Sequence, residues 1–266
     1  MIMLSYQTLW LSFAATVMAE RLFMTEKPTF FKHCTADMPD YEECYKSNLQ
    51  SMLIEYKNGI PGLATGDKFE PLHIRRIRIA QDELSIRLKN VTVHGISGAN
   101  ITKIRHDPND YTFRAQIFLP ALRLTADFRA NGRLLFLPIN NSGKLMLEAR
   151  SVKLAFLFTL RLQDEGNQTF ADPRAVHSKI IEIGDFHLRL RQFLAGSAEL
   201  EDTINELLNE LWRDVIEVLR PTLENAINTV TLARLKSVLN FIPANYFISD
   251  IPSAAKLYAE DVVEVP

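Results

Sequence analysis

The sequence predicts an α+β fold in which a long, kinked C-terminal helix is wrapped by a strongly curved antiparallel β-sheet. Between Ala198 and Leu239, apolar residues recur every three to four positions, which is typical of an amphipathic helix. Between Pro71 and Arg191, apolar and polar residues alternate instead, which is typical of antiparallel strands with one wet face. The apolar residues of the helix cover an arc of roughly 200°. We therefore expect the apolar face of the sheet to enclose it.

The first 19 residues have the features of a secretory signal peptide. They carry no charged side chain, contain an apolar run from Leu9 to Val17 and end in a pattern suited to signal peptidase. That run is shorter than the roughly 20 residues that span a bilayer, and no later segment qualifies as transmembrane. We expect residues 1–19 to be removed, so that the protein is secreted and extracellular. There, the only two cysteines, Cys34 and Cys44, should form a disulfide.

A helix is predicted directly after the cysteines. Asp40 and Glu43 form a capping-box pattern at its start, and Asn58-Gly59 ends it. The disulfide would fix its N-terminal end and leave its C-terminal end free to swing as a lid. Its apolar face is predicted to close one mouth of an apolar channel with four residues, Tyr45, Leu49, Met52 and Leu53.

The strand region shows clear side-chain parity. One strand places three large apolar residues inward, Leu122, Leu124 and Phe128, and four polar residues outward, Arg123, Thr125, Asp127 and Arg129. Asn131-Gly132 and Asn141-Ser142-Gly143 predict hairpin turns. The long strand Leu145–Leu162, which carries Phe156 and Phe158, is expected to curve or to contain a bulge.

The long helix is expected to begin at the N-cap Ser197 and to present Trp212 on its apolar face. Pro221 should kink it or begin a second helix. We place one domain at residues 31–252 and a flexible acidic tail at residues 253–266.

Composition and motifs argue against several functions. The net charge of -2 gives no electrostatic case for nucleic acid or for an anionic membrane surface. Ser97 lies in a sequence that departs from the lipase G-x-S-x-G pattern at Ala99. The six histidines are scattered without metal-ligand spacing, and no phosphate-binding glycine loop is present. We predict neither an enzyme nor a cofactor.

Large apolar side chains are abundant, with 16 Phe, two Trp and seven Met. They can form a packed core or line a cavity, because a sheet rolled around a long helix tends to leave an apolar channel. The cavity hypothesis assigns the lining to Tyr45, Leu49, Met52, Leu53, Leu122, Leu124, Phe128, Phe156, Phe158 and Trp212.

Several short motifs, in this order, resemble the insect takeout and juvenile-hormone-binding protein family. They are Cys34 and Cys44, Gly59-Ile60-Pro61, Glu70-Pro71-Leu72-His73-Ile74, Leu119-Pro120-Ala121-Leu122, Leu135-Phe136-Leu137-Pro138-Ile139, Asn209-Glu210-Leu211-Trp212, Leu219-Arg220-Pro221 and Phe241-Ile242-Pro243. The resemblance implies a secreted carrier of the tubular lipid-binding type, with an internal tunnel for hydrophobic ligands such as terpenoids. Glycines usual in the family are replaced at Ala126 and in the turn Asn140-Asn141-Ser142-Gly143, so ligand identity does not transfer.

The leading hypothesis is a secreted, monomeric carrier of a juvenile-hormone-like terpenoid or fatty lipid, with a cell-surface receptor as a candidate partner. One alternative is an extracellular interaction or signalling factor of the same fold without an exchangeable ligand. The other is a serine esterase that uses Ser97. Four sequons, at Asn90, Asn100, Asn140 and Asn167, predict a glycoprotein.

Overall fold

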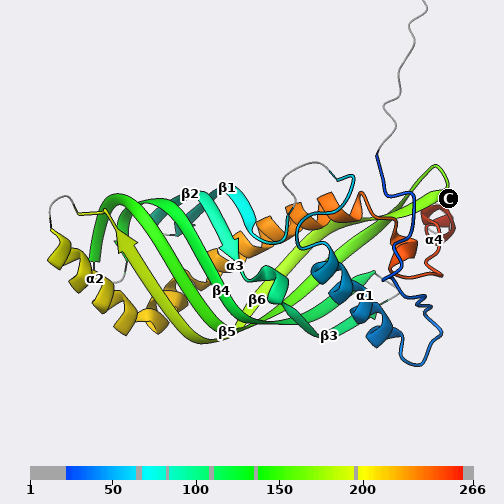
Figure 1. The fold of residues 1–266 in the computed structure, drawn as a ribbon, viewed down its shortest axis with the longest axis horizontal. Helices are drawn as coiled ribbons and strands as arrows, with labels where there is room; N and C mark the ends of the chain where they lie inside the picture. Colours follow the sequence, from blue (N-terminus) through cyan, green and yellow to red (C-terminus); the bar gives the residue numbers. More distant parts are fainter. Residues whose placement is uncertain are drawn as a thin grey trace, which may run out of the picture.

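The structure is a computed structural model that describes residues 22–63, 68–81, 84–107, 111–134, 137–194 and 197–259. The predicted signal peptide, residues 1–19, lies outside the described residues. Figure 1 shows an elongated molecule in which a curved sheet lies against long C-terminal helices. A shorter helix, formed by residues 41–55, lies towards the end of the molecule opposite residues 198–210. The predicted α+β fold class is confirmed.

All strand pairs in the single sheet are antiparallel, in the order β1-β2-β4-β5-β6, with β3 also paired to β4. The strands β2 and β3 share one edge of β4, so that β3 pairs with residues 112–118 and β2 with residues 123–131. The bounds are Leu72–Gln81 for β1, Leu84–His94 for β2, Asn100–Asp107 for β3, Thr112–Leu134 for β4, Leu137–Glu165 for β5 and Gln168–Arg191 for β6.

The two hairpin turns predicted from asparagine and glycine were wrong. Asn131 pairs with Asn140 inside the β4–β5 ladder, which extends to the pair formed by Leu134 and Leu137. Neither predicted turn is therefore where β4 gives way to β5, because both lie within paired strands. Gly143 lies within β5, where a Cβ atom would approach the backbone oxygen of Arg191 to 2.3 Å. This glycine permits close strand packing, and continuous pairing outweighs the local turn preference.

The sheet curves at bulges in its long strands. Register shifts occur between Lys153 and Leu154 and between Thr159 and Leu160, where β5 pairs with β6. These shifts confirm the bulge predicted for the long strand. A further shift follows Lys89 in β2, where Asn90 has a φ of 53°. Each extra residue bends its strand and increases the local twist, which allows the sheet to wrap around the helices.

In the part of the chain that the structure describes, four helices accompany the sheet: α1 at Tyr41–Glu55, α2 at Ala198–Glu210, α3 at Trp212–Leu239 and α4 at Ala254–Leu257. Two short 3-10 helices, η1 and η2, lie at Ile96–Gly98 and Ala244–Tyr246. Asp40 and Ser197 are the N-cap residues of α1 and α2, as predicted, but neither side chain makes a cap hydrogen bond. Glu43 instead pairs with Lys46 one turn further along α1.

The long helix is interrupted at Leu211, whereas a kink or the start of a second helix was expected at Pro221. Leu211 has φ and ψ of -96° and 18°, and α2 and α3 meet there at an angle (Figure 1). Pro221 lies inside α3. Pro221 and Glu217, whose carbonyl loses its helical donor, are both exposed, so water can replace the missing hydrogen bond. The bend at Leu211 lets both helices follow the curved edge of β6.

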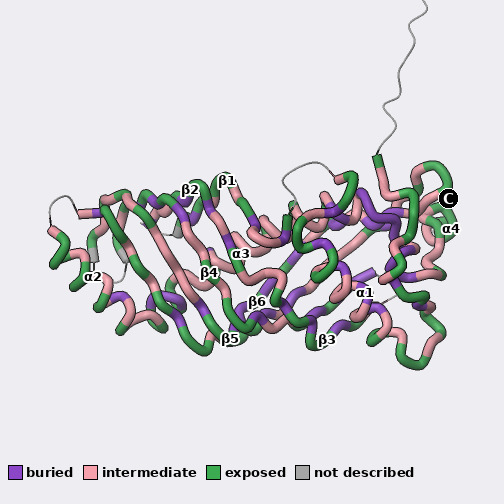
Figure 2. The backbone as a smooth tube through the Cα atoms, viewed as in Figure 1, coloured by how far each residue is buried: buried purple, intermediate pink, exposed green. Residues whose placement is uncertain are grey.

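The predicted side-chain parity of β4 is confirmed. Arg123, Asp127 and Arg129 are exposed, whereas Phe128 is buried. Leu122, Leu124 and Phe128 belong to the same apolar cluster as Ile204 of α2 and Val230 of α3. Figure 2 shows that fully buried positions concentrate around α1 and the C-terminal segment, while much of the half beside α2 is only partly buried.

The short helix α4 lies within the segment predicted as a flexible tail. Leu257 and Tyr258 pack against a buried cluster that contains Tyr111 and Leu162, and the Leu162 N–H donates to the Tyr258 hydroxyl at 2.9 Å. Residues 260–266 lie outside the described residues.

Candidate functional site

Side chains of α2 close the outer edge of β6, so that helix and strand form one wall. The Asn205 amide accepts from the Leu190 N–H at 2.7 Å and donates to the Leu190 carbonyl at 2.9 Å. Asn209 does the same with Leu188, at 2.7 and 2.8 Å. The Glu201 carboxylate accepts from three consecutive N–H groups, those of residues 192–194. We call this row of contacts the polar seam.

The polar seam continues on α3. Asn228 accepts from the Ser178 N–H at 2.6 Å, and Glu224 accepts from the Ile180 N–H at 2.9 Å. Because these acceptors are spaced four residues apart, as are Glu201, Asn205 and Asn209, they lie along one helix face. On the other side of α3, Arg234 donates to the carbonyl of His73 in β1 at 2.9 Å. The helix thus reaches both edges of the curved sheet.

The space between sheet and helices is lined by apolar side chains that are only partly buried. They come from three neighbouring strands and from α3, and they pack in clusters that contain residues of both layers. By contrast, Phe113, Phe170 and Ile242 at the α1 end are between 0% and 3% exposed. The partly buried set comprises Leu122, Leu124, Leu145, Leu147, Leu188, Leu190, Leu219, Leu223, Ile227 and Val230. Such an apolar lining with residual accessible surface is characteristic of a lipophilic binding region.

The ten residues predicted to line the cavity are distributed over three clusters along this interior. The four residues of α1 pack at one end, against a cluster that includes Phe31 and Phe113. Phe156, Phe158 and Trp212 lie in the middle cluster, and Leu122, Leu124 and Phe128 lie in the cluster towards α2. Leu53 and Phe158 contact both the first and the middle cluster. The set therefore follows the length of the interior.

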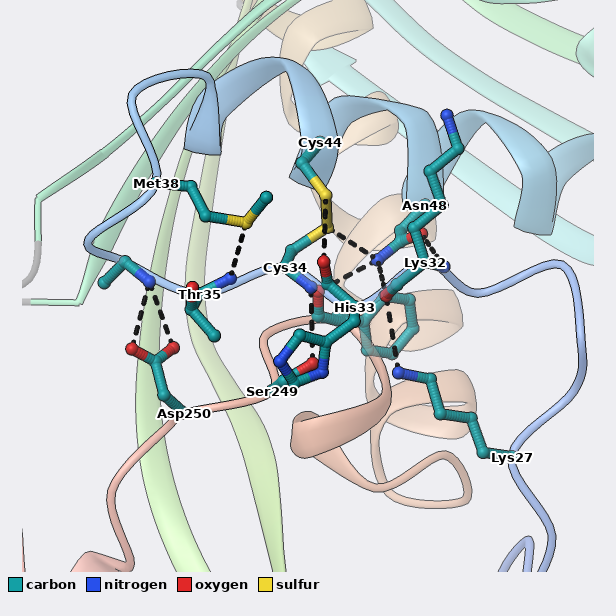
Figure 3. Close-up of a disulfide and its surroundings, with 12 residues drawn as sticks. Lys27, Lys32, His33, Cys34, Thr35, Met38, Cys44, Asn48, Ser249 and Asp250 are labelled. Atoms are coloured by element: carbon teal, nitrogen blue, oxygen red, sulfur yellow. Dashed lines mark hydrogen bonds between the residues drawn. A yellow bond between two sulfur atoms is a disulfide. The ribbon is translucent and has the colours of Figure 1, made fainter.

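The disulfide between Cys34 and Cys44 is present, with the two Cα atoms 5.7 Å apart, and it confirms the predicted pairing. Figure 3 shows the buried Asn48 beside it. The Asn48 amide, which is 0% exposed, accepts from the Lys32 N–H at 2.7 Å and donates towards the carbonyls of Lys32 and Phe247, both at 3.1 Å. Asn48 thus joins three segments of the chain at one point.

The second half of α1 is also fixed. Gln50 donates to the carbonyl of Ala99 at 2.9 Å and accepts from the Ile101 N–H at 2.9 Å. Met52 is buried in the same end cluster as Tyr56, which directly follows the helix. The sequence indicated only the N-terminal attachment. A signal for Asn48 was available, because a polar residue lies on the apolar stripe of Tyr45, Leu49 and Met52; Gln50 gave no such signal.

An aromatic cluster lies beneath α1 at this end. The rings of Tyr45 and Phe113 are 5.4 Å apart, and Phe113 stacks on His106 at 4.3 Å. The hydroxyl of Tyr41 lies 3.0 Å from Nδ1 of His106. Burial raises the pKa of the Tyr45 hydroxyl well above its usual range, so this group stays protonated and neutral. The α1 end is therefore mainly apolar but contains the hydroxyl groups of Tyr41 and Tyr45 and the ring of His106.

The family model for haemolymph juvenile hormone binding protein matches residues 9–249, which is most of the chain. The chain belongs to the haemolymph juvenile hormone binding protein family. This match agrees with the family resemblance of its motifs.

Relatives of this family member have diverged strongly in sequence. A putative beta-carotene-binding protein of Schistocerca gregaria is 23% identical over 227 residues, which cover 84% of this chain and 90% of that protein. The circadian clock-controlled protein daywake of Drosophila yakuba is 22% identical and covers 77% of this chain and 83% of its own length. The crystal structure of Epiphyas postvittana Takeout 1 superposes with a TM-score of 0.66 at 21% identity, covering 79% of this chain and 96% of that one. The two proteins share the fold.

In this family member, Ser97 belongs to a turn held by a carboxylate. Glu70 accepts from the N–H groups of Gly95 and Ser97, at 2.9 and 3.3 Å, and from the Ser97 hydroxyl at 3.3 Å. Nδ1 of His94 lies 3.2 Å from the same carboxylate. A serine nucleophile needs a base that accepts its proton and a third group that orients that base. Here Ser97 and His94 both contact the Glu70 carboxylate, so the carboxylate stabilises the turn and the histidine is not placed as a base for the serine.

Two remaining features concern the surface and the helices. All four sequon asparagines, Asn90, Asn100, Asn140 and Asn167, are exposed. Among the described residues, no helix is both long and apolar enough to cross a membrane, and no group of three His, Cys, Asp or Glu side chains could hold a metal ion.

Proposed function

We propose that this protein is a secreted carrier that holds a small, elongated hydrophobic molecule between the curved sheet and the helices α2 and α3. The observation that carries the proposal is the row of partly buried leucine, isoleucine and valine side chains along both layers of the interior. Apolar surface of this kind is stabilised when a ligand covers it. A terpenoid-sized ligand that buries about 350 Å² gains roughly 9 kcal/mol gross, which leaves micromolar affinity after association costs.

The ligand class is a flexible or rod-shaped hydrocarbon with few polar groups. The family description names juvenile hormone, and the locust relative is named for beta-carotene, which is built from isoprene units as terpenoids are. The proposed lining consists of the ten residues distributed along the interior, with Tyr45 and Leu49 at the α1 end and Trp212 at the junction of α2 and α3. We further propose a monomeric glycoprotein that uses its exposed sequons and meets a receptor on cells.

Transport rather than catalysis is the activity that this arrangement favours. Among the described residues, the partly buried lining of the interior consists of leucine, isoleucine and valine, and the contacts of Ser97 suit a structural turn. A carrier needs only to exclude water from its ligand and to release it, which an apolar interior achieves without reactive side chains.

A pair of variants on neighbouring residues of β4 tests the proposal. Leu124 faces the helices and Thr125 faces outward, so Leu124→Trp fills the interior whereas Thr125→Trp adds the same bulk outside. We expect Leu124→Trp to weaken binding of a fluorescent fatty acid about tenfold or more, as overfilling an apolar site does. Thr125→Trp should bind as the wild type does.

The measurement is a fluorescence titration, accompanied by thermal unfolding to show that both variants fold. Equal affinities for Leu124→Trp and Thr125→Trp, with both proteins folded, would refute the interior as the binding site. Mass spectrometry of an organic extract of the natively purified protein then identifies the molecule carried.

A further inference from the structure

The outer face of the sheet, opposite the apolar interior, carries a group of cationic side chains on β1, β2, β4, β5 and β6. These strands run beside α2 in Figure 1. Residues that pair directly across antiparallel strands point to the same face. Arg78 pairs with Arg87, and Arg87 pairs with Arg129, so three arginines lie in one row across β1, β2 and β4. The adjacent row contains Arg76, Lys89, Asp127, Lys144 and Arg191. With Arg189 beside Arg191 on β6, these residues form what we call the basic face.

The basic face is exposed and almost free of compensating acid. All eight of its cations are exposed, and none of them forms an ion pair within the part of the chain that the structure describes. The one carboxylate among them, Asp127, accepts from the Asn90 amide at 2.7 Å. Like charges directly opposite each other on a sheet are destabilising. The fold therefore carries a repulsion that an anionic partner would relieve.

Two surface hollows adjoin the basic face. One, of about 370 Å³, has Asp127, Lys144, Arg189 and Arg191 in its lining. The other, of about 560 Å³, is lined by Arg129, by polar residues at the start of β5 and by residues 192–194, which include Phe193 and Leu194. Cations at the rims of such hollows can contact an anion from two sides, and the arginine fork matches an oxyanion in a bidentate manner.

We propose that the basic face binds a linear sulfated polysaccharide. Neighbouring strands lie about 4.8 Å apart, so each row offers closely spaced cations along a line that crosses several strands. This face is convex because the sheet wraps around the helices. A flexible polysaccharide can follow a convex surface, whereas a flat bilayer would touch it over a small area only. The exposed large apolar residues of the described chain, Leu22, Ile54, Ile181, Leu200 and Val218, all lie outside the basic face, whereas a membrane-binding surface also inserts apolar side chains.

Nucleic acid fits the basic face less well than a sulfated sugar chain. Proteins that hold single strands stack the bases on aromatic side chains. The residues of the basic face are arginine, lysine and aspartate, and Thr125 and Met146 continue the same surface. The basic face is thus suited to a polymer that carries closely spaced anionic groups and has no rings that need to stack. The binding would retain the carrier at a polyanionic matrix while the interior, on the opposite face, keeps its ligand.

Heparin binding by the full chain, measured calorimetrically at two salt concentrations, tests the proposal. Binding is measured on the protein as purified and again after deglycosylation, because the sequons at Asn90 and Asn140 border the basic face. In the variant Arg87→Gln/Arg129→Gln we expect affinity to fall about tenfold or more and the salt dependence to become shallower, as lost ionic contacts require. The pair Arg105→Gln/Arg114→Gln is the matched control, since these two arginines also lie directly opposite each other but near the α1 end.

Each outcome decides between the alternatives. A loss confined to Arg87→Gln/Arg129→Gln, with weak binding of the unsulfated chain hyaluronan, supports the proposal. A second variant of the basic face, Lys144→Gln/Arg191→Gln, should show the same loss, and thermal unfolding should find both variants at least as stable as the wild type. Equal losses in the control pair, no heparin binding by the wild type, or tighter binding of phosphatidylserine vesicles or duplex DNA than of heparin would overturn it.

Discussion

Replacing the two asparagines of the polar seam should detach α2 from the sheet. In Asn205→Leu/Asn209→Leu the side chains keep a similar volume but lose the four hydrogen bonds to the backbone of Leu188 and Leu190. At about 0.5 to 1.5 kcal/mol net for each bond, the loss amounts to roughly 2 to 6 kcal/mol. Because both strand residues keep some solvent contact, we expect the lower end of this range.

Amide hydrogen exchange reports this change locally. Protection of the Leu188 and Leu190 amides should fall by about 30-fold or more, corresponding to 2 kcal/mol, while strands distant from α2 keep theirs. Asn225→Leu, on the exposed side of α3, is the control and should leave exchange unchanged. If Leu188 and Leu190 stay as protected as in the wild type, the polar seam does not hold α2, and the wall described here is maintained by apolar packing alone.

Four further predictions concern α1 and the edge of β6. Asn48→Ala should lower the free energy of unfolding in urea by about 2 to 4 kcal/mol. The buried carbonyl of Phe247 and the partly buried N–H and carbonyl of Lys32 each lose a hydrogen bond, and an unchanged midpoint would contradict this. Removing the disulfide with Cys34→Ser/Cys44→Ser should cost about 2.5 to 3 kcal/mol for its short loop, and the same urea midpoint measures it. Hydrogen bonds from the Leu194 N–H and its neighbours lower the pKa of Glu201. The ionised carboxylate therefore stabilises the β6 end at pH values above its usual pKa, and this effect is lost as the pH falls through the lowered pKa. Protection of the Leu194 amide should fall in acid, and in Glu201→Gln it should no longer depend on pH. Because both halves of α1 are fixed, Leu49→Arg tests a ligand contact at the α1 end and not the swinging lid expected from the sequence. It should weaken fatty-probe binding by several-fold relative to the surface variant Arg123→Glu, and equal affinity of the folded proteins would exclude the contact.

Strand identity and parity were predictable because they depend on neighbours along the chain. The alternation around Leu124 and Phe128 places side chains on two faces whatever the strands do elsewhere. The positions of the reversals were not predictable from Asn131-Gly132, because the turn preference of two residues competes with a ladder formed by residues on both strands. For the same reason the break at Leu211 was missed, since the curved edge of β6 determines where the helix must bend.

The sequence predicted which side chains of the candidate site face inward, but not where each lies along the length of the interior. The sequence indicated which side chains turn inward, yet it could not place Tyr45 and Phe128 at different ends of a long interior. The polar seam depends on which strand forms the edge of the sheet, and this follows only from strand order. The net charge of -2 likewise concealed the basic face, because opposite charges cancel in a sum although they occupy different surfaces.

The contacts of Asn48 also order events during synthesis of the chain. Its partner Phe247 is separated from it by 199 residues, and the neighbouring contact between Cys34 and Ser249 spans 215 residues. Contacts this distant form only after the intervening chain has been made and its loop-closure entropy has been overcome. The strands of the sheet can pair with their immediate neighbours as they emerge, whereas the α1 end waits for the last residues. A nascent chain halted before Phe247 would therefore expose the aromatic cluster under α1, and this intermediate is the one most in need of a chaperone.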